Sequence, residues 1–355
     1  MNPLLRAEAK LAGLASRARR GPPIALPASG EGLQASSRAH AQPSVSCVVP
    51  CFNEAESLAQ FLPMLANTLA GCAPAWEVIL VDDGSTDATP LVLAAWSQRD
   101  GFRVLQLSRN FGKEAALTAG LQAARGDVVV QMDADGQHAP HMIPRFLAGW
   151  AEGADVVYAM RENRSDESGF KRWGSRWFYK LVNAQARFEV PAGAGDFRLM
   201  DRRVVDALLL LPERNRFMKG LYAWIGFNAL ALPYTPAPRT HGRSRFSPLQ
   251  LIHLSMDGLT AFTTWPLRAV SAVGFTLALL AFGYGAYLVL EYLIYGHGVS
   301  GWTTIVVSLM LFSGIQLVSL GVVGEYVGRI FEEVKARPLY VVQRELGRGL
   351  PATGQ

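Results

Sequence analysis

The sequence predicts an α/β domain with a mostly parallel sheet, followed by helices that lie in and cross a membrane. From residue 44 to residue 135, short β-branched runs alternate with segments of helical apolar spacing, an order typical of a parallel sheet covered by helices on both faces. Near the C-terminus, two uncharged runs are each long enough to cross a bilayer. A mean hydropathy of +0.15 and an 18% share of charged residues also fit a soluble domain joined to a small membrane part.

The elements of the α/β domain follow one another closely along the chain. The runs SVSCVVP, WEVILVDDGS, FRVLQLS and DVVVQMDAD are rich in β-branched residues and predict strands. The segments between these runs place apolar residues at helical spacing. In chain order we expect strand 44–50, helix 54–69, strand 76–85, helix 89–98, strand 102–108, helix 113–126 and strand 127–135.

The N-terminal segment and the cysteines exclude several classes of protein. Residues 1–43 predict a flexible basic extension, because SRARRGPP carries charge and no uncharged apolar stretch of a secretory signal follows it. Cys47, Cys51 and Cys72 form neither a disulfide framework nor a paired zinc motif. We expect Cys47 to be a small apolar residue of a buried strand.

The net charge of +5 fits anionic lipids or small anionic substrates, and no nucleic-acid recognition motif is present.

The chain divides into the α/β domain, a membrane part and a C-terminal tail. We expect a cytoplasmic domain at 44–265, a membrane segment at 266–330 and a cytoplasmic C-terminal tail at 331–355. Two transmembrane helices are predicted at about 267–292 and 302–326, where neither run has a polar face that a soluble core helix would need.

The positive charges around these helices predict their orientation. Arg268 precedes the first uncharged run, and Arg329, Lys335 and Arg337 follow the second, whereas the loop between the two has no Lys or Arg. By the positive-inside rule, both flanks are cytoplasmic and the loop faces out. We therefore expect a multi-pass protein of the inner (plasma) membrane.

Two further helices are predicted at the membrane surface, near 168–187 and 247–264. In the first, Phe170, Trp173 and Trp177 fall on one helical stripe and basic residues occupy the rest. Such a basic amphipathic helix suits the headgroup layer of a membrane. For both segments, ordinary packing against the domain core is the alternative.

The motif MDADGQH predicts a metal site. Asp133 and Asp135 lie one residue apart at the end of a predicted strand, and on an extended segment they would point the same way. Their hard carboxylate oxygens select Mg²⁺ or Mn²⁺ over softer metals. Gln137 can add a third oxygen, and His138 is a less suitable candidate.

Other polar residues follow neighbouring strands of the predicted sheet, at the edge where ligands of such sheets gather. Asp82 and Asp83 begin the sequence DDGSTD, and a carboxylate here can accept the imide N–H of a pyrimidine or bind a ribose hydroxyl. Pro50 and Asn53 shape the loop after the first strand, and Glu54 begins the next helix, where an acid is favoured.

The segment SRNFGKEAAL predicts a phosphate contact. Lys113 lies just before a helix N-terminus and beside Gly112. A cation and the free N–H groups of a helix start together suit a phosphate group.

These motifs together resemble the family 2 glycosyltransferases that load sugars onto polyprenyl phosphates, in the branch of dolichol-phosphate mannose synthase and the bactoprenol glucosyltransferases. The resemblance covers about residues 44–343. It rests on VVPCFNE, VDDGSTD, NFGKEAALTAG, MDADGQH, GDFRLMDRRVVD and GVVGEYVGRIFEEVKARPLYVV in that order. Gly136 stands where a leucine is commoner, and Asn53 replaces the frequent tyrosine.

The resemblance implies a GT-A-type nucleotide-sugar-binding domain and a role for each matching residue. Residues of the donor site would be Pro50, Asn53, Glu54, Asp82, Asp83, Lys113 and Asp133. The metal ligands would be Asp133, Asp135 and Gln137, holding Mg²⁺ or Mn²⁺. Asp196 matches the acid proposed as catalytic. Residues that meet the phosphates of acceptor and donor would be Arg198 and Arg202, with Arg239, Ser244 and Arg245 in a mobile acceptor loop at 239–246.

The resemblance also implies an activity. The chain would move one sugar, with inversion, from a nucleotide diphosphate sugar to undecaprenyl phosphate or a similar polyprenyl phosphate, for cell-envelope glycan modification such as that of lipopolysaccharide. A UDP-sugar is favoured over a GDP-sugar, the sugar itself stays open, and a homo-oligomer such as a tetramer is suggested. Because a lipid monophosphate is already largely dianionic at neutral pH, we expect Asp196 to orient an arginine or the sugar more than to act as a base.

Two alternatives remain. A processive polysaccharide synthase would need more membrane spans and usually a Q-x-x-R-W motif, but the nearest string, GFKRW, has Gly169 in place of the glutamine. A non-catalytic membrane scaffold or lipid carrier on a transferase-like domain is disfavoured by the intact pair Asp133 and Asp135. Binding and hydrolysis of the donor distinguish an enzyme from a scaffold.

Overall fold

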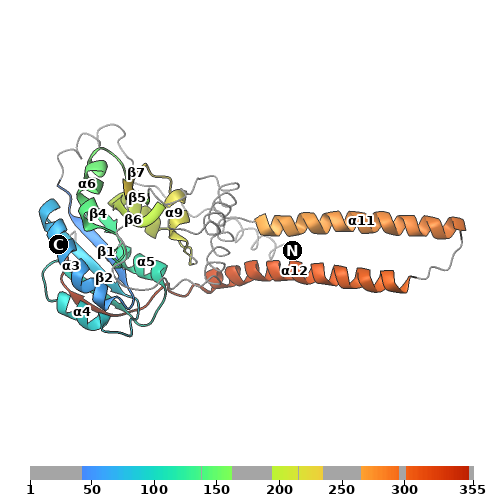
Figure 1. Ribbon diagram of the computed structural model, residues 1–355, viewed down its shortest axis with the longest axis horizontal. Coiled ribbons are helices and arrows are strands. Elements are labelled where there is room, and N and C mark those ends of the chain that lie inside the picture. The colour runs from blue at the N-terminus through green and yellow to red at the C-terminus, as the bar shows by residue number, and fades with distance from the viewer. Residues whose placement is uncertain are drawn as a thin grey trace, which may run out of the picture.

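The computed structural model describes residues 42–136, 138–161, 194–214, 216–234, 265–295 and 301–351. They form an α/β domain and a two-helix hairpin that extends from it (Figure 1). The strands are β1 (Val45–Cys51), β2 (Trp76–Asp82), β3 (Phe102–Leu107), β4 (Val128–Gln131), β5 (Val156–Arg161), β6 (Ala194–Asp201), β7 (Ala229–Tyr234) and β8 (Val342–Gly347). The helices are α3 (Ala55–Cys72), α4 (Thr89–Trp96), α5 (Lys113–Ala123), the short 3₁₀ helix η1 (Pro140–Met142), α6 (Ile143–Ala151), α8 (Arg202–Leu209), α9 (Met218–Trp224), α11 (Trp265–Tyr295) and α12 (Trp302–Lys335).

One sheet runs through the α/β domain, with the strand order β7-β5-β6-β4-β1-β2-β3-β8. β4, β1, β2 and β3 are mutually parallel, as are β5 and β7, whereas β6 and β8 run antiparallel to their neighbours. The carboxyl ends of the four central parallel strands therefore meet at one edge of the sheet, which we call the carboxyl edge. β6 begins at this edge and ends at the opposite one, the amino edge.

Helices cover both faces of the sheet because alternate strand residues point to opposite sides. On β1, Cys47 and Val49 enter the core shared with α3, α4 and α6, while Val48 enters the core shared with α5, α8 and α9. All three of these β1 residues are fully buried. α5 lies close on the sheet at Gly120, where any Cβ atom would collide with Val48.

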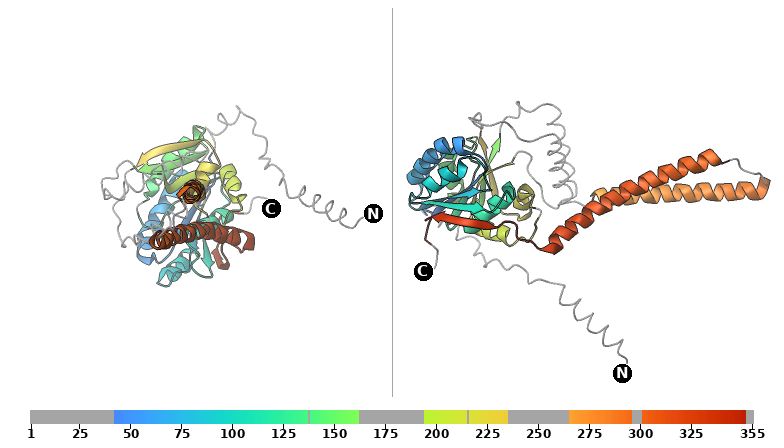
Figure 2. Two further views of the ribbon diagram at one scale, coloured as in Figure 1. Left: turned by 90° about the vertical axis from the view of Figure 1, so that its right-hand side faces the viewer. Right: turned by 90° about the horizontal axis from the view of Figure 1, so that it is seen from below.

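The C-terminal segment returns to the α/β domain after the hairpin. β8 pairs with β3 along the edge of the sheet (Figure 2). Arg103 of β3 bonds to Glu345 of β8 at 2.5 Å. Beyond the strand, the carbonyl oxygen of Leu350 accepts a bond of 2.6 Å from Nη1 of Arg125. β8 therefore covers an edge that would otherwise expose unpaired backbone groups.

The hairpin differs from the domain in what surrounds its apolar residues. α11 and α12 extend side by side from the same side of the domain (Figures 1 and 2). Both helices are long and apolar enough to cross a membrane, by length and composition. The most apolar stretch of each helix is not buried within the structure. The described end of α12 contacts the domain, where the backbone N–H of Arg214 donates to Glu333 at 2.8 Å.

The sequence predictions for the fold are confirmed in most particulars. The predicted strands and helices from residue 44 to residue 126 are present, and the sheet is mostly parallel. The strand expected at 127–135 ends at Gln131, and the chain bends at residues 134–136. β8 was not expected in the tail. The predicted interfacial helices and nearly all of the N-terminal extension lie outside the described residues.

Candidate active site

Charged side chains from three elements meet at the carboxyl edge. Lys113 is the first residue of α5, Asp133 follows the end of β4, and Asp196 lies near the start of β6. Nζ of Lys113 is 2.7 Å from Oδ1 of Asp133 and 2.7 Å from Oδ2 of Asp196. One ammonium group thus bridges a carboxylate that follows β4 and a carboxylate on β6, although 83 residues separate Lys113 from Asp196 along the chain.

The bridge determines the charges of the cluster. Burial alone would lower the pKa of Lys113, but Asp196 and Asp133 raise it above its ordinary value, so the lysine stays charged. Burial alone would raise the pKa of Asp196, but Lys113 and Lys219 hold it well below its usual range. Asp196 is therefore ionised at neutral pH and is a weak proton acceptor.

Asp83 holds the loop that positions Lys113. Its Oδ1 accepts the backbone N–H of Phe111 at 2.7 Å, and its Oδ2 accepts that of Gly112 at 2.9 Å. Gly112 has a φ of 96°, a left-handed conformation that favours glycine. Burial raises the pKa of Asp83 above its ordinary value despite these two bonds. The carboxylate is thus committed to the backbone just before α5, and its predicted contact with a nucleobase stays a prediction.

Asn53 and Asp82 hold the two loops that follow β1 and β2. Asn53 has a φ of 55°, and its Oδ1 accepts the backbone N–H of Thr86 at 2.8 Å. Asp82 accepts the backbone N–H of Ser85 at 2.9 Å. The side chain of Glu54 accepts a bond from Ser57 at 3.0 Å. These residues and Pro50, within β1, lie toward the carboxyl edge as expected, and their contacts build the loops there.

The segment with Asp133 and Asp135 is a turn and not an extended strand. β4 ends two residues before Asp133, and Gly136 has a φ of 75°. The argument that the two carboxylates share one face by strand alternation is therefore wrong. Nδ1 of His138 accepts the backbone N–H of Asp133 at 2.8 Å, so this nitrogen is not available to a metal.

The described part of the site contains no group of three or more His, Cys, Asp or Glu side chains placed to hold a metal ion. Gln137 lies outside the described residues. Asp133 nevertheless suits a divalent cation, because its side chain is 25% exposed and both its oxygens are hard donors that already face a cation, the ammonium of Lys113. Asp133 therefore fits Mg²⁺ or Mn²⁺ as one carboxylate ligand.

Arg198 is a buried residue of β6. It lies two residues after Asp196 on β6 and so shares its face of the sheet, but it is only 3% exposed. Its guanidinium group lies 3.5 Å from the ring centre of Tyr222 and donates to the carbonyl oxygen of Gly195 at 2.7 Å. Arg198 is therefore covered by Tyr222 and supports the strand that carries Asp196, and its contact with a phosphate stays a prediction.

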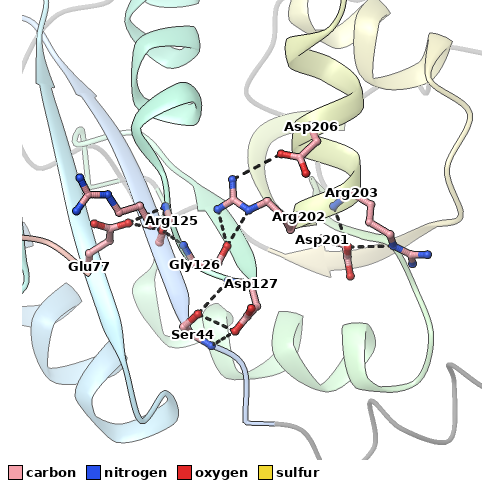
Figure 3. Close-up of polar contacts among 10 residues, drawn as sticks. Ser44, Glu77, Arg125, Gly126, Asp127, Asp201, Arg202, Arg203 and Asp206 are labelled. Atoms are coloured by element: carbon pink, nitrogen blue, oxygen red, sulfur yellow. Dashed lines mark hydrogen bonds and ion pairs between the residues drawn. The ribbon is translucent and has the colours of Figure 1, made fainter. Parts of the chain in front are cut away.

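Arg202 lies at the wrong edge of the sheet for its predicted role. Because β6 runs antiparallel to β4, the end of β6 pairs with Val128 at the start of β4. Both Nε and Nη2 of Arg202 donate to the carbonyl oxygen of Gly126, and Asp206 lies 4.0 Å away (Figure 3). The prediction that Arg202 meets a phosphate beside Asp196 is therefore wrong, since it lies at the amino edge.

The remaining predicted residues divide into two groups. Arg239, Ser244 and Arg245 lie outside the described residues, and their contacts with the acceptor phosphate stay predictions. Cys47 is a buried residue of β1 as expected, and burial raises the pKa of its thiol.

Two features of the site were missed. Glu114 follows Lys113, and its Oε2 is buried with no hydrogen-bond partner among the described residues. Burial, and then Asp196, raise the pKa of Glu114 to about 8. His138 stacks on Phe197, a contact that joins segments about 60 residues apart and has no signal in the local sequence.

Comparison with known proteins identifies the family. The model of glycosyl transferase family 2 matches residues 46–209. An uncharacterized glycosyltransferase of Synechocystis is 39% identical over 299 residues, which are 84% of this chain and 94% of that protein. The prophage-derived bactoprenol glucosyl transferase of Shigella flexneri is 41% identical over 86% of this chain and 99% of its own length. A prophage bactoprenol glucosyl transferase homolog of Escherichia coli is 40% identical over 84% and 98%.

The matches extend well past the α/β domain, since each covers more than four fifths of this chain. They agree with the fold, whose mostly parallel sheet and flanking helices are those of a GT-A-type domain. The chain belongs to glycosyltransferase family 2.

Proposed function

We propose that this chain transfers one sugar from a nucleotide diphosphate sugar to a polyprenyl phosphate, with inversion at the anomeric carbon. The observation that supports it most is the bridge of Lys113 between Asp133 and Asp196 at the carboxyl edge of the sheet. Relatives named bactoprenol glucosyl transferase, about 40% identical over nearly their whole length, support the lipid acceptor. A UDP-sugar as donor, undecaprenyl phosphate as acceptor and a product used in cell-envelope glycans complete the proposal.

The transfer needs little proton chemistry. A phosphate oxygen of the acceptor forms a bond to the anomeric carbon while the bond from that carbon to the nucleoside diphosphate breaks. A lipid monophosphate with a second pKa of about 6 is largely dianionic at pH 7 and is already a competent nucleophile. The depressed pKa of Asp196 suits a residue that orients Lys113 or the sugar and not one that removes a proton.

The leaving group requires positive charge. The diphosphate gains negative charge as it departs, and two opposite charges about 4 Å apart attract by about 4 kcal/mol at an effective dielectric constant of 20. Lys113, the first residue of α5, can supply one such charge together with the N-terminus of its helix. Asp133 and Asp135, with Gln137, would hold Mg²⁺ or Mn²⁺, which supplies further positive charge when bound.

A lipid acceptor explains why the hairpin is joined to this domain. The exposed apolar surfaces of α11 and α12 suit a bilayer, and the bond from Arg214 to Glu333 keeps the end of α12 against the domain. In the proposed arrangement, the domain and both termini are cytoplasmic at the inner membrane. A homo-oligomer is part of the same proposal.

The test is direct. Purified full-length protein with Mn²⁺ is incubated with a panel of nucleotide sugars and undecaprenyl phosphate, and the lipid product is weighed by mass spectrometry. One donor should add one sugar mass to the lipid and should do so less well in the presence of a chelator. Failure of every donor to bind would instead favour a non-catalytic scaffold, and repeated addition of sugar would favour a processive synthase.

A further inference from the structure

The side chain of His138 connects two parts of the active site. Its Nδ1 accepts the backbone N–H of Asp133 at 2.8 Å, which closes the turn that carries the Asp133 carboxylate. An accepting Nδ1 carries no proton, so the proton of the neutral ring is on Nε2. The residue is only 7% exposed, so this contact is shielded from competing water.

The ring of His138 is held in place by aromatic packing. It stacks on Phe197, with ring centres 5.0 Å apart and planes inclined by 18°. Phe197 is fully buried and packs in turn on Phe146 at 4.7 Å and near Tyr234 at 6.4 Å. The imidazole therefore has one orientation, and its Nδ1 points at one backbone group.

Phe197 is the neighbour of Asp196 on β6, and successive strand residues point to opposite faces of the sheet. On one face, Phe197 bears against His138; on the other, Asp196 bonds to Lys113, which also bonds to Asp133. The turn after β4 is thus tied to β6 twice, once by the stacked rings and once by the ammonium bridge. This double connection fixes the separation of the two carboxylates.

We propose that His138 is a positioning residue for Asp133, holding that carboxylate at the place where the donor diphosphate and its cation bind. This rests on the function proposed above. His138 acts through two contacts. Its Nδ1 accepts the backbone N–H that closes the turn, and its ring, stacked on Phe197, fixes the position of that turn relative to β6. A residue that served only to fill the core would need neither the nitrogen nor its orientation.

Two substitutions separate these roles. His138→Phe keeps an aromatic ring for Phe197 but removes the acceptor, whereas His138→Asn keeps an acceptor at the δ1 position and loses the ring. His141→Phe is the matched control, since His141 is exposed three residues further along the chain. Full-length variants are compared in transfer kinetics with UDP-sugar and in Mn²⁺ binding, measured by the quenching of tryptophan fluorescence without donor or acceptor.

We expect His138→Phe to remain folded and to lose about 10- to 100-fold in kcat/KM for the donor and in Mn²⁺ affinity. His138→Asn should recover most of both, and His141→Phe should match the unsubstituted protein. Unchanged kinetics and Mn²⁺ binding in His138→Phe would overturn the proposal. So would equal losses in His138→Phe and His138→Asn, since the acceptor would then be irrelevant.

A third variant covers the case in which His138→Phe does not fold. Phe197→Leu weakens the stack and leaves the acceptor intact. It should therefore lower Mn²⁺ affinity, but by less than removal of the acceptor does. Unchanged Mn²⁺ affinity in Phe197→Leu would count against the double connection. Asp133→Asn distinguishes the two proposals. If Asp133→Asn is inactive while His138→Phe is fully active, the positioning role alone fails; if the unsubstituted protein transfers no sugar to a polyprenyl phosphate, the proposed function itself fails.

Discussion

Polar clusters occupy both edges of the same sheet, yet they differ in what their side chains bind. At the amino edge, charged and hydroxyl side chains bond mostly to backbone groups: Glu77 accepts the N–H group of Arg125, and Arg202 donates to Gly126 (Figure 3). Glu77 also accepts the N–H group of Leu350. At the carboxyl edge, Lys113 bonds to two carboxylate side chains and remains partly exposed.

The difference has a physical consequence. A charged side chain that bonds to buried backbone replaces hydrogen bonds that water would have made, so its loss costs stability. A charged side chain that bonds to partly exposed side chains, as Lys113 does to Asp133 and Asp196, can exchange those partners for a ligand at little cost to the fold. The partner of a charged side chain is therefore more informative than its edge: Asp82 and Asp83 at the carboxyl edge also bond to backbone and build loops, whereas Lys113 bonds only to carboxylate side chains in the described contacts.

The largest effect should be the loss of sugar transfer caused by a substitution at the carboxyl edge. Asp133→Asn removes a carboxylate that faces Lys113 and that would hold the divalent ion, so transfer should fall by about 10³-fold or more, with a melting temperature close to that of the unsubstituted protein. Product formation per mole of folded protein measures this loss. Asp127→Asn is the matched control, because Asp127 bonds to Ser44 at the amino edge. A comparable loss in this control would remove the distinction between the edges.

The next effect should be a loss of stability at the amino edge. Glu77 is fully buried and accepts from Ser46 at 2.6 Å, Arg125 at 2.9 Å and Leu350 at 3.0 Å. Glu77→Ala leaves these donors without their acceptor and should lower the free energy of unfolding by about 3 kcal/mol or more. Thermal unfolding measures it, and the specific activity of the folded fraction should be retained. Glu77→Gln keeps an acceptor oxygen and should lose less.

A third effect tests the charge of Asp196. If this residue orients and does not act as a base, Asp196→Asn should keep a near-native rate at pH 7.5. Its rate should fall about tenfold per pH unit below the acceptor phosphate pKa of about 6. The measurement is a pH profile of transfer from pH 5 to pH 8.5. A loss of many orders of magnitude at every pH would show that Asp196 removes a proton after all.

A smaller effect concerns Glu114, whose pKa is raised to about 8 in the folded protein. Between about 4.3, the ordinary value, and about 8, the folded state holds a proton that the unfolded state has lost, so stability falls as pH rises, by up to about 1.4 kcal/mol per pH unit. Glu114→Gln should abolish this slope and raise the melting temperature at pH 8. Parallel pH profiles of melting temperature for the two proteins would contradict the raised pKa of Glu114.

The smallest effect should be that of Arg202→Lys. Lysine can keep one of the two bonds to Gly126, so stability should fall by no more than about 1 kcal/mol, and both kcat and KM should be unchanged because the residue lies at the amino edge. A raised KM for donor or acceptor would show that Arg202 contacts the substrates. The amino edge would then also take part in substrate binding.

The sequence by itself determined the order of strands and helices up to residue 126, the mostly parallel sheet and the two long apolar helices. It did so because these follow from local periodicity: alternate or continuous apolar residues for strands, helical spacing for helices, and length for membrane spans. It also placed Asp82, Lys113 and Asp133 at the carboxyl edge, since in a parallel sheet every strand delivers its following loop to the same side.

Only the tertiary structure decided which charges meet. Arg198 and Arg202 are four residues apart and look equivalent in the sequence, but one lies under Tyr222 and the other at the opposite edge, because β6 runs antiparallel to β4. The bridge from Lys113 to Asp196, the stack of His138 on Phe197 and the pairing of β8 with β3 join residues far apart along the chain. Such contacts depend on the path of the whole backbone, which no local pattern of residues encodes.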